Sequence, residues 1–346
     1  MPPSPLTGLP TGQLYCYNEQ GIEIPCNNSG QDAEFAAGQS WPQPRFKAEG
    51  ETVVDRVTGL CWTRSANIAE FPLAWQEALD FVADMNREQS LGFDDWRLPN
   101  RRELRSLLDF QQTRPALPQG HPFTGVFQNW YWTSTSAAIS PDHAWYVHMG
   151  GARMFYGGKD QSYMLWPVRG SSNGLLAATG QIHCFDANGR LIDCAGSGQD
   201  GEYRAGTPWP QPRFSVAGDA VIDHLTGLCW AQNASLSDTP VTWCEALARV
   251  SELNRDQHER FWRLPDINEL ESLVDCARAR PALTGPGLFT HIKDVYWSST
   301  TSTYEPDWAW ALYMDKGATG VGQKYLPQFH IWPVASADQG RLKPDQ

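Results

Sequence analysis

The sequence has no long apolar run and no excess of positive charge. None of its apolar stretches approaches the ~20 residues of a membrane-spanning helix, so we expect no membrane insertion. The formal net charge is −12, whereas proteins that bind nucleic acid carry basic surfaces that contact the phosphates. We therefore expect no nucleic-acid partner.

Motifs for metal binding and catalysis are also scarce. The eight cysteines include no CxxC pair, and no His or Cys spacing indicates a zinc site. No histidine recurs at a matching position in both halves of the chain, so Cys61 and Cys229 lack a predicted base that would make them nucleophiles. We expect both thiols to be buried and unreactive, and we expect no enzymatic activity.

The composition is typical of a folded protein from an oxidising compartment. A chain of 346 residues is longer than a typical single domain and is long enough for two. With 16 Trp and 41 % hydrophobic residues, its composition is that of a folded protein and not of a disordered one. An even number of cysteines favours disulfides, and hence an extracellular, periplasmic or cell-surface location. Residues 1–9 lack the basic start and apolar run of a secretion signal, as expected of a mature or trimmed N-terminus.

The strongest signal is an internal repeat of about 160 residues. The first copy begins TGQLYCYNEQGIEIPC, the second begins TGQIHCFDANGRLIDC, and both continue to the same WPQPRF segment. The motifs GLCW, WRLP and WPV then recur in the same order. The predicted organisation is a linker (1–10), a first domain (11–170), a linker (171–178), a second domain (179–336) and a tail (337–346).

Each copy combines helices with short strands. Apolar positions in residues 75–85 and 243–253 follow a 3.6-residue period, which predicts one helix in each copy. Residues 100–103 (NRRE) and 266–269 (DINE) form capping boxes that predict the start of a second helix. With short strands around residues 53–62 and long Gly-rich loops, the pattern predicts an α+β fold.

Two disulfides are predicted from hairpins. Cys16 and Cys26 stand at the two ends of one predicted hairpin, and Cys184 and Cys194 at the ends of its counterpart. Facing positions on antiparallel strands satisfy disulfide geometry, so we expect each pair to be bridged.

A third disulfide is predicted from joint occurrence. Cys244 and Cys276 are both absent from the first copy, which has Gln76 and Phe110 in their places. This predicts a Cys244–Cys276 bridge between the two helices. Two unrelated buried thiols are the alternative.

The order of motifs resembles a known domain family. GLCW, a helix that begins with Trp, WRLPNRREL, YWTSTS, AWYV and a terminal WPVRG are similar to the C-terminal domain family of the Legionella collagen-like adhesin (Lcl), over nearly the whole of both copies. That family in turn is similar to the C-type-lectin-like fold shared by formylglycine-generating enzymes. The resemblance implies two tandem domains, each with two helices, a twisted antiparallel sheet and a face of long loops. It also implies adhesion and binding of sulfated glycans.

Two departures from these relatives bear on function. The oxidising enzymes of the superfamily use a pair of cysteines late in the domain, and no cysteine follows Cys61 in the first copy or Cys276 in the second. Calcium-dependent lectins carry an acidic Pro loop followed by Trp-Asn-Asp. This chain has Glu305-Pro306-Asp307 without Trp-Asn-Asp, so a Pro-Asp turn is the favoured interpretation and calcium the alternative.

Candidate ligand residues lie in the loops that differ between the copies. Exposed aromatic rings suit sugar contacts because they combine a flat apolar face with a polar edge, whereas the recurring Trp residues are expected in the core. A lysine before the last strand is common to both copies and could contact a ligand or pair with an acid. The candidates are Tyr156, Lys159, Tyr163, Glu305, Asp307, Trp308 and Lys324.

Two further sets of charged residues are candidate sites. Arg101, Arg102 and Arg105 form the one local basic cluster, either an anion patch or, as we favour, a solvated helix face. Paired acids recur in GQDAE and GQDGE, as calcium candidates or, as we favour, as turns braced by their own backbone. Those acids are Asp32, Glu34, Asp200 and Glu202.

Taken with the resemblance, these features predict a non-enzymatic extracellular module that binds a glycan or cell-surface protein through its loop face. Two tethered copies would gain avidity on a common surface. No cofactor is expected, with calcium as the alternative. A structural subunit without a small ligand is the alternative function, in which the WPQPRF segment would mediate docking between domains.

Overall fold

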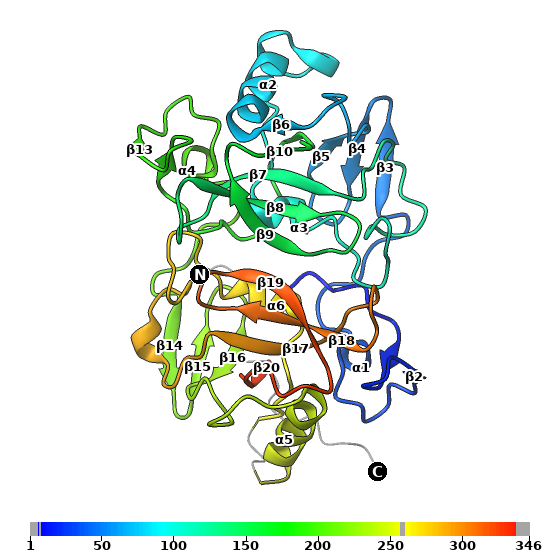
Figure 1. Cartoon of the computed structure of the whole chain (residues 1–346), viewed down its shortest axis with the longest axis vertical. Helices are drawn as coiled ribbons and strands as arrows, with labels where there is room; N and C mark the ends of the chain where they lie inside the picture. The colour runs from blue at the N-terminus through cyan, green and yellow to red at the C-terminus, as the bar shows by residue number, and fades with distance from the viewer. Residues whose placement is uncertain (1–5, 7, 257–259, 337–346) are drawn as a thin grey trace. The chain divides into compact units, whose positions relative to one another are not determined.

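The computed structural model describes residue 6 and residues 8–256 and 260–336 (Figure 1). The chain forms two compact units. Unit 1 comprises residues 1–39, 209–274 and 283–346, and unit 2 comprises residues 40–208 and 275–282. No helix among the described residues is both long and apolar enough to cross a bilayer.

The compact units do not coincide with the sequence repeats. Residues 11–39, which begin the first repeat, belong to unit 1 together with the body of the second repeat. Residues 179–208, which begin the second repeat, belong to unit 2 together with the body of the first. We call these two stretches hairpin segment 1 and hairpin segment 2. We call residues 40–178 the first body and residues 209–274 with 283–336 the second body.

The body of unit 2 contains two larger antiparallel sheets, two α-helices and a short antiparallel pairing of residues 73–74 with 162–163. One sheet has the order β11–β5–β4–β3, and in the other β7 pairs with β8 and β8 with β9. Its elements are β3 (Phe46–Glu49), β4 (Thr52–Asp55), β5 (Cys61–Thr63), β6 (Leu73–Ala74), α2 (Trp75–Arg87), η1 (Ser90–Gly92), α3 (Arg101–Arg105), β7 (Trp130–Ser136), β8 (His143–His148), β9 (Met154–Gly158), β10 (Ser162–Tyr163), β11 (Val168–Arg169), β12 (Cys184–Phe185), β13 (Leu191–Ile192) and α4 (Asp200–Tyr203).

Unit 1 repeats this plan. One sheet has the order β14–β15–β16–β20, and in the other β17 pairs with β18 and β18 with β19. Its elements are β1 (Cys16–Tyr17), β2 (Glu23–Ile24), α1 (Asp32–Phe35), β14 (Phe214–Ala217), β15 (Ala220–Asp223), β16 (Leu228–Ala231), α5 (Trp243–Asp256), α6 (Ile267–Ser272), η2 (Pro286–Leu288), β17 (Val295–Thr301), β18 (Trp308–Tyr313), β19 (Ala318–Gln323) and β20 (Val334–Ser336). The protein is therefore an α+β protein with two tandem domains, as the sequence predicts.

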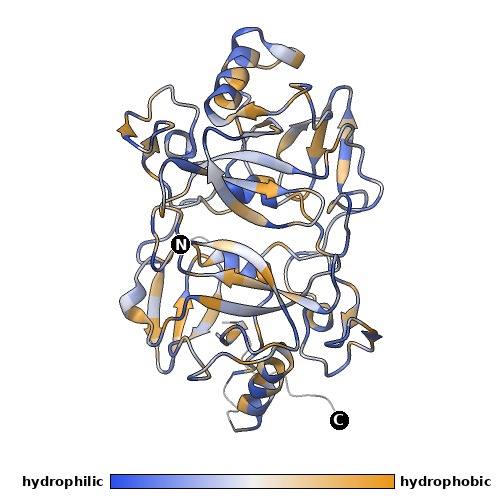
Figure 2. Ribbon diagram, in the orientation of Figure 1, coloured by the Kyte–Doolittle hydropathy of each residue, from blue (hydrophilic) through white to orange (hydrophobic). Residues whose placement is uncertain are grey.

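The long helices α2 and α5 cover the cores in the way their periodicity predicts. Figure 2 shows hydrophilic and hydrophobic residues alternating along both helices. The first residue of each, Trp75 or Trp243, is fully buried, and its indole N–H donates to a backbone oxygen at Thr133 or Ser298 at 2.7 Å. A buried Trp whose N–H is satisfied stabilises the core without leaving an unpaired donor.

The WPQPRF segment has an internal structural role in each unit. Arg45 pairs with Asp55 at 2.9 Å and also donates to the carbonyl of Ser106. Arg213 and Asp223 form the same buried pair in unit 1. The aspartates also accept from the turn that follows them, at the backbone N–H of Val57 in unit 2 and of Leu225 in unit 1, so each aspartate braces a turn.

Candidate functional site

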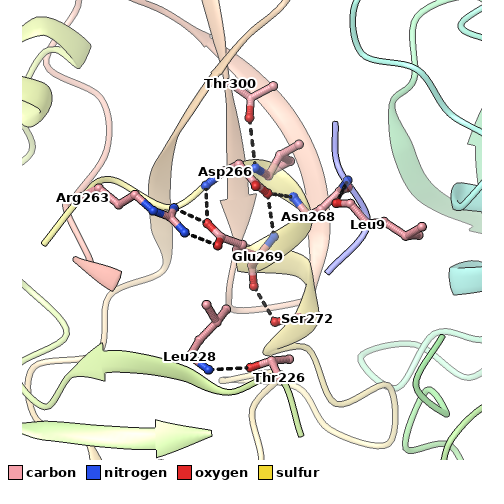
Figure 3. Close-up of polar contacts among 10 residues, drawn as sticks. Leu9, Thr226, Leu228, Arg263, Asp266, Asn268, Glu269, Ser272 and Thr300 are labelled. Carbon is pink, nitrogen blue, oxygen red and sulfur yellow. Dashed lines mark hydrogen bonds and ion pairs between the residues drawn. The ribbon is translucent and has the colours of Figure 1, made fainter. Parts of the chain in front are cut away.

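The polar residues shared by the two copies converge where a hairpin segment docks on a body. The short helix after the RLP motif provides the base of this docking site. In unit 1 the Arg263 guanidinium forms an ion pair with Glu269, and Asp266 caps the helix by accepting from the backbone N–H groups of residues 268 and 269 (Figure 3). Both predicted capping boxes are confirmed, because Asn100 and Glu103 form the same arrangement in unit 2.

This helix is held to β17 and to the chain next to hairpin segment 1. The Ile267 N–H donates to the Thr300 hydroxyl at 3.0 Å, and the Asn268 amide donates to the Leu9 carbonyl at 2.9 Å (Figure 3). In unit 2 the Asn100 amide donates to Ala205 at 3.1 Å. The capping residue or its neighbour therefore reaches the chain just before hairpin segment 1 in unit 1 and the end of hairpin segment 2 in unit 2.

A buried aspartate joins each hairpin segment to a strand. Thr300 donates to Asp32 at 2.6 Å, and Thr135 donates to Asp200 at 2.7 Å. Thr179, from hairpin segment 2 itself, also donates to Asp200 at 2.7 Å. Burial raises the pKa of both Asp32 and Asp200 to about 6, although the hydrogen bonds from the threonine hydroxyls lower it. The charge of the nearby helix glutamate, Glu269 in unit 1 and Glu103 in unit 2, raises the pKa further.

A glutamine in each segment satisfies the backbone of the same strand. Gln13 donates to the Thr301 carbonyl at 2.6 Å and accepts from the Thr301 N–H at 2.9 Å. Gln181 makes the same two bonds with Ser136, at 3.0 and 2.8 Å. One side-chain amide thus pairs with both backbone groups of a buried residue, as a neighbouring strand would.

The two lysines predicted as ligand contacts instead anchor the hairpins. Lys324 is fully buried and donates to the carbonyls of Tyr17 and Asn18 at 3.1 and 3.3 Å. Lys159 donates to the corresponding carbonyls in hairpin segment 2 at 3.0 and 3.2 Å. Each ammonium lies over the face of the first Trp of the long helix, at 4.0 Å in unit 2 and 4.2 Å in unit 1. Burial lowers the pKa of both lysines to about 7.

The acidic Pro loop also meets the hairpin. A Cβ placed on Gly21 would lie 3.3 Å from Cβ of Pro306, and the φ of Gly21 is +76°. Glu305 and Asp307 are half-buried in this loop, and Asp307 accepts from the Lys324 backbone N–H at 2.9 Å. Gly189 packs in the same way against residues 141–142 in unit 2. The loops expected to be a free ligand face therefore contact a hairpin segment.

The paired acids have different partners. Asp32 points to the strand as described, whereas Glu34 accepts from the backbone N–H groups of Asn28 and Gly30, both at 2.7 Å. Glu202 braces the equivalent turn in hairpin segment 2. Among the described residues no group of three potential metal ligands occurs. These contacts account for Asp32, Glu34, Asp200 and Glu202 as parts of the docked segments.

The arginine cluster differs from both interpretations of the sequence. Arg101, Arg102 and Arg105 are 0, 6 and 6 % exposed, so neither a surface anion patch nor a solvated helix face is correct. The Arg101 guanidinium lies 4.1 Å from the centre of the Trp145 ring, and Arg102 donates to the Ala178 carbonyl at 2.9 Å. The helix is buried on all sides because it lies between the sheet and the docked segment.

The cysteines confirm two of the three predicted bridges. Cys16–Cys26 and Cys184–Cys194 are disulfides, and Cys61 and Cys229 are buried thiols as expected. The Cys244–Cys276 prediction is wrong, since both thiols are free. Cys244 lies on α5 in unit 1, where Glu19 is among its neighbours, whereas Cys276 belongs to unit 2 and donates its N–H to the Thr179 carbonyl.

Three predicted aromatic candidates are half-buried. Trp308 begins β18, and the Tyr156 ring packs edge-on against Trp145 at 5.2 Å. Tyr163 contacts the rings of Trp132 and Tyr146 at 4.7 and 4.8 Å. The structure therefore places Tyr163 in an aromatic cluster of unit 2.

That cluster forms a patch that the sequence analysis missed. Trp130 is partly exposed and lies 4.3 Å from Tyr146 and 4.8 Å from His148. We call Trp130, Tyr146, His148 and Tyr163 the aromatic patch. The strand registers give Val295, Ala311 and Tyr313 as the counterparts of the first three in the second repeat. This replacement of Trp and Tyr by smaller residues is the signal that could have revealed the patch.

Comparison with known proteins agrees with the repeat. The family model of the Lcl C-terminal domain matches residues 51–169 and again residues 219–335. No curated protein matches the chain. The two matches cover the bodies and more than half of the chain, and each begins after the hairpin segment of its repeat. The chain therefore belongs to the Lcl C-terminal domain family, with one such domain in each repeat.

Proposed function

We propose that this protein is an extracellular binding module that holds a carbohydrate on the aromatic patch of unit 2. The observation that carries the proposal is the difference between the two bodies. Their docking residues are matched contact for contact, so a shared structural need explains them. In the second body Val295 and Ala311 stand where the patch has the rings of Trp130 and Tyr146. The rings of Trp297, Tyr313 and Phe329 still pack together there, so the difference is the loss of these two rings.

The chemistry of the patch suits a sugar ring. A pyranose presents an apolar face that packs on Trp and Tyr rings, while its hydroxyls need nearby donors and acceptors. The Tyr163 hydroxyl donates to the exposed Gln161 side chain at 2.8 Å, so an amide and a phenol stand beside the rings. Trp130 supplies the partly exposed ring face on which a sugar would stack.

His148 adds a defined hydrogen-bond donor. Its Nδ1 accepts from the backbone N–H groups of Gly150 and Gly151 at 3.2 and 3.1 Å, which leaves the ring proton on Nε2. Burial lowers the pKa of His148, and the charge of Arg153 adds to the effect. The ring is therefore neutral at pH 7 and can donate to a sugar hydroxyl.

The proposed location follows from the disulfides. Two bridges in short hairpins form and persist in oxidising compartments. An extracellular or cell-surface setting is also where glycan ligands occur. No metal takes part in the proposed contact.

A glycan array with the full chain tests the proposal. We expect binding to a defined sugar class that Trp130→Val, which introduces the residue of the second repeat, reduces by at least tenfold. Tyr313→Ala in unit 1 is the matched control and should leave binding unchanged. Binding should also persist when calcium is replaced by a chelator. Absence of binding by folded protein would refute the glycan ligand, and equal binding by Trp130→Val would refute the patch.

A further inference from the structure

The exchange of hairpin segments between the repeats has a consequence for assembly. Each hairpin segment docks on the body of the other repeat, and it does so through the same set of contacts. The aspartate–threonine, glutamine–backbone, lysine–carbonyl and glycine–loop contacts recur one for one in the two units. Each body therefore binds a hairpin segment through the side chains and backbone groups of that segment. Where the segment lies along the chain does not enter into these contacts.

The two docking events differ in how the chain connects them. Hairpin segment 2 docks on the body that directly precedes it, so residues 40–208 form one continuous stretch of unit 2. Hairpin segment 1 docks on the second body, which begins at residue 209 and is separated from it by the whole of the first body. Closure of unit 1 thus depends on a segment delivered from a distant part of the sequence.

From this geometry we propose that the second body accepts hairpin segment 1 from a second copy of this chain, so that copies join by segment exchange. The contacts formed in the exchanged complex are those already present within unit 1, so no new surface is needed. Domain swapping of this kind requires only that a segment be supplied by another protomer. The segment is suited to it, because a disulfide keeps the hairpin closed while it is undocked.

Concentration decides between the closed chain and the exchanged one. A tethered segment competes with segments of other chains at an effective concentration that is millimolar for short flexible linkers and lower for longer ones. Chains at micromolar concentration should therefore be closed monomers. Chains crowded to ~1 mM, as on a densely covered surface, should exchange segments to a substantial extent.

A cysteine trap tests the exchange in trans. Gly21→Cys in one chain and Pro306→Cys in another, both with Cys244→Ser, place two thiols at the docking contact, where the ideal Cβ atoms lie 3.3 Å apart. Cβ atoms of disulfides are about 3.5–4.5 Å apart, so a small adjustment allows the bond. Mixing the two chains under oxidising glutathione should give a covalent heterodimer with the introduced cysteines bridged. Its yield should rise with chain concentration.

The chain with both substitutions is the control. It should form the bridge within one molecule and stay monomeric at micromolar concentration. The left-handed backbone at Gly21 costs a cysteine about 1–2 kcal/mol, and this control shows whether docking survives that cost. A bridged double variant together with no heterodimer at ~1 mM would overturn the proposal.

A second measurement needs no substitution at the contact. Isotope-labelled and unlabelled wild-type chains, mixed at ~1 mM and diluted into native mass spectrometry, should give a mixed dimer. Asp32→Lys, which places a cation against the buried Thr300 hydroxyl, should remove the mixed dimer while leaving unit 2 folded. Monomers alone from the wild-type mixture would refute the exchange, as would a mixed dimer undiminished by Asp32→Lys.

Discussion

Asp200→Asn gives the sharpest test of how the hairpin segments are held. Asp200 is 1 % exposed, and burial raises its pKa from 3.8 to about 6. Because the folded-state pKa is above the unfolded one, this carboxyl contributes stability that is fully present below pH 3.8 and lost as the pH rises through 6. A shift of about two pKa units corresponds to about 3 kcal/mol of unfolding free energy.

The substitution removes that dependence. An Asn oxygen still accepts from the hydroxyls of Thr135 and Thr179, which both donate to one oxygen of Asp200. The other oxygen of Asp200 has no hydrogen-bond partner among the residues that the structure describes, so the Asn N–H₂ group would be unpaired at a cost of about 1–3 kcal/mol. The variant should therefore be less stable than wild type at pH 4 and equal or more stable at pH 7.

Urea unfolding followed by Trp fluorescence at pH 4, 5.5 and 7 measures this. The difference in unfolding free energy between variant and wild type should change by about 2–3 kcal/mol over that range. Asp160→Asn, at an exposed position of the same unit, is the control and should give a constant difference. A constant difference for Asp200→Asn would refute the assignment of a buried, neutralisable carboxyl at the docking contact.

Three further changes probe the same architecture. Lys159→Met should lower the stability of unit 2 by about 2 kcal/mol or more, because two backbone carbonyls lose their donor and the Trp75 ring loses its cation. Amide hydrogen exchange should then be faster in hairpin segment 2 and unchanged in hairpin segment 1. Replacing Cys184 and Cys194 by Ser should cost about 3 kcal/mol by the loop-entropy relation, with an unchanged thermal midpoint contradicting it. Arg45→Met should cost about 3–5 kcal/mol because it leaves the Asp55 carboxylate buried without its cation, and an effect below 1 kcal/mol would argue against that pair.

Local features of the fold could be predicted from the sequence because they depend on neighbouring residues. The capping boxes at 100–103 and 266–269 and the two hairpin disulfides each involve residues within 10 positions of one another. The long helices follow from their periodicity. The starts of the second helices were predictable but their ends are set by packing, since α3 ends at Arg105 and the buried Leu107 and Leu108 follow it.

The docking site could not be predicted because it joins residues far apart in the sequence. Asp32 and Thr300 are 268 positions apart, and nothing local to Lys324 indicates that carbonyls of hairpin segment 1 cover it. The burial of Arg101 and the free thiol of Cys244 have the same origin. The shared lysines Lys159 and Lys324, for example, bind backbone carbonyls of a segment from the other repeat.

The exchanged segments also determine what a cut in the chain would do. Residues 171–174, at the boundary between the repeats, are largely exposed. A protease that cleaves there produces two fragments of similar length. Hairpin segment 1 of the first fragment stays docked on the second body, and hairpin segment 2 of the second fragment stays docked on the first body. The nicked protein should therefore migrate as one particle in native chromatography and as two bands in denaturing gels. The two fragments would stay together through the docked hairpin segments alone.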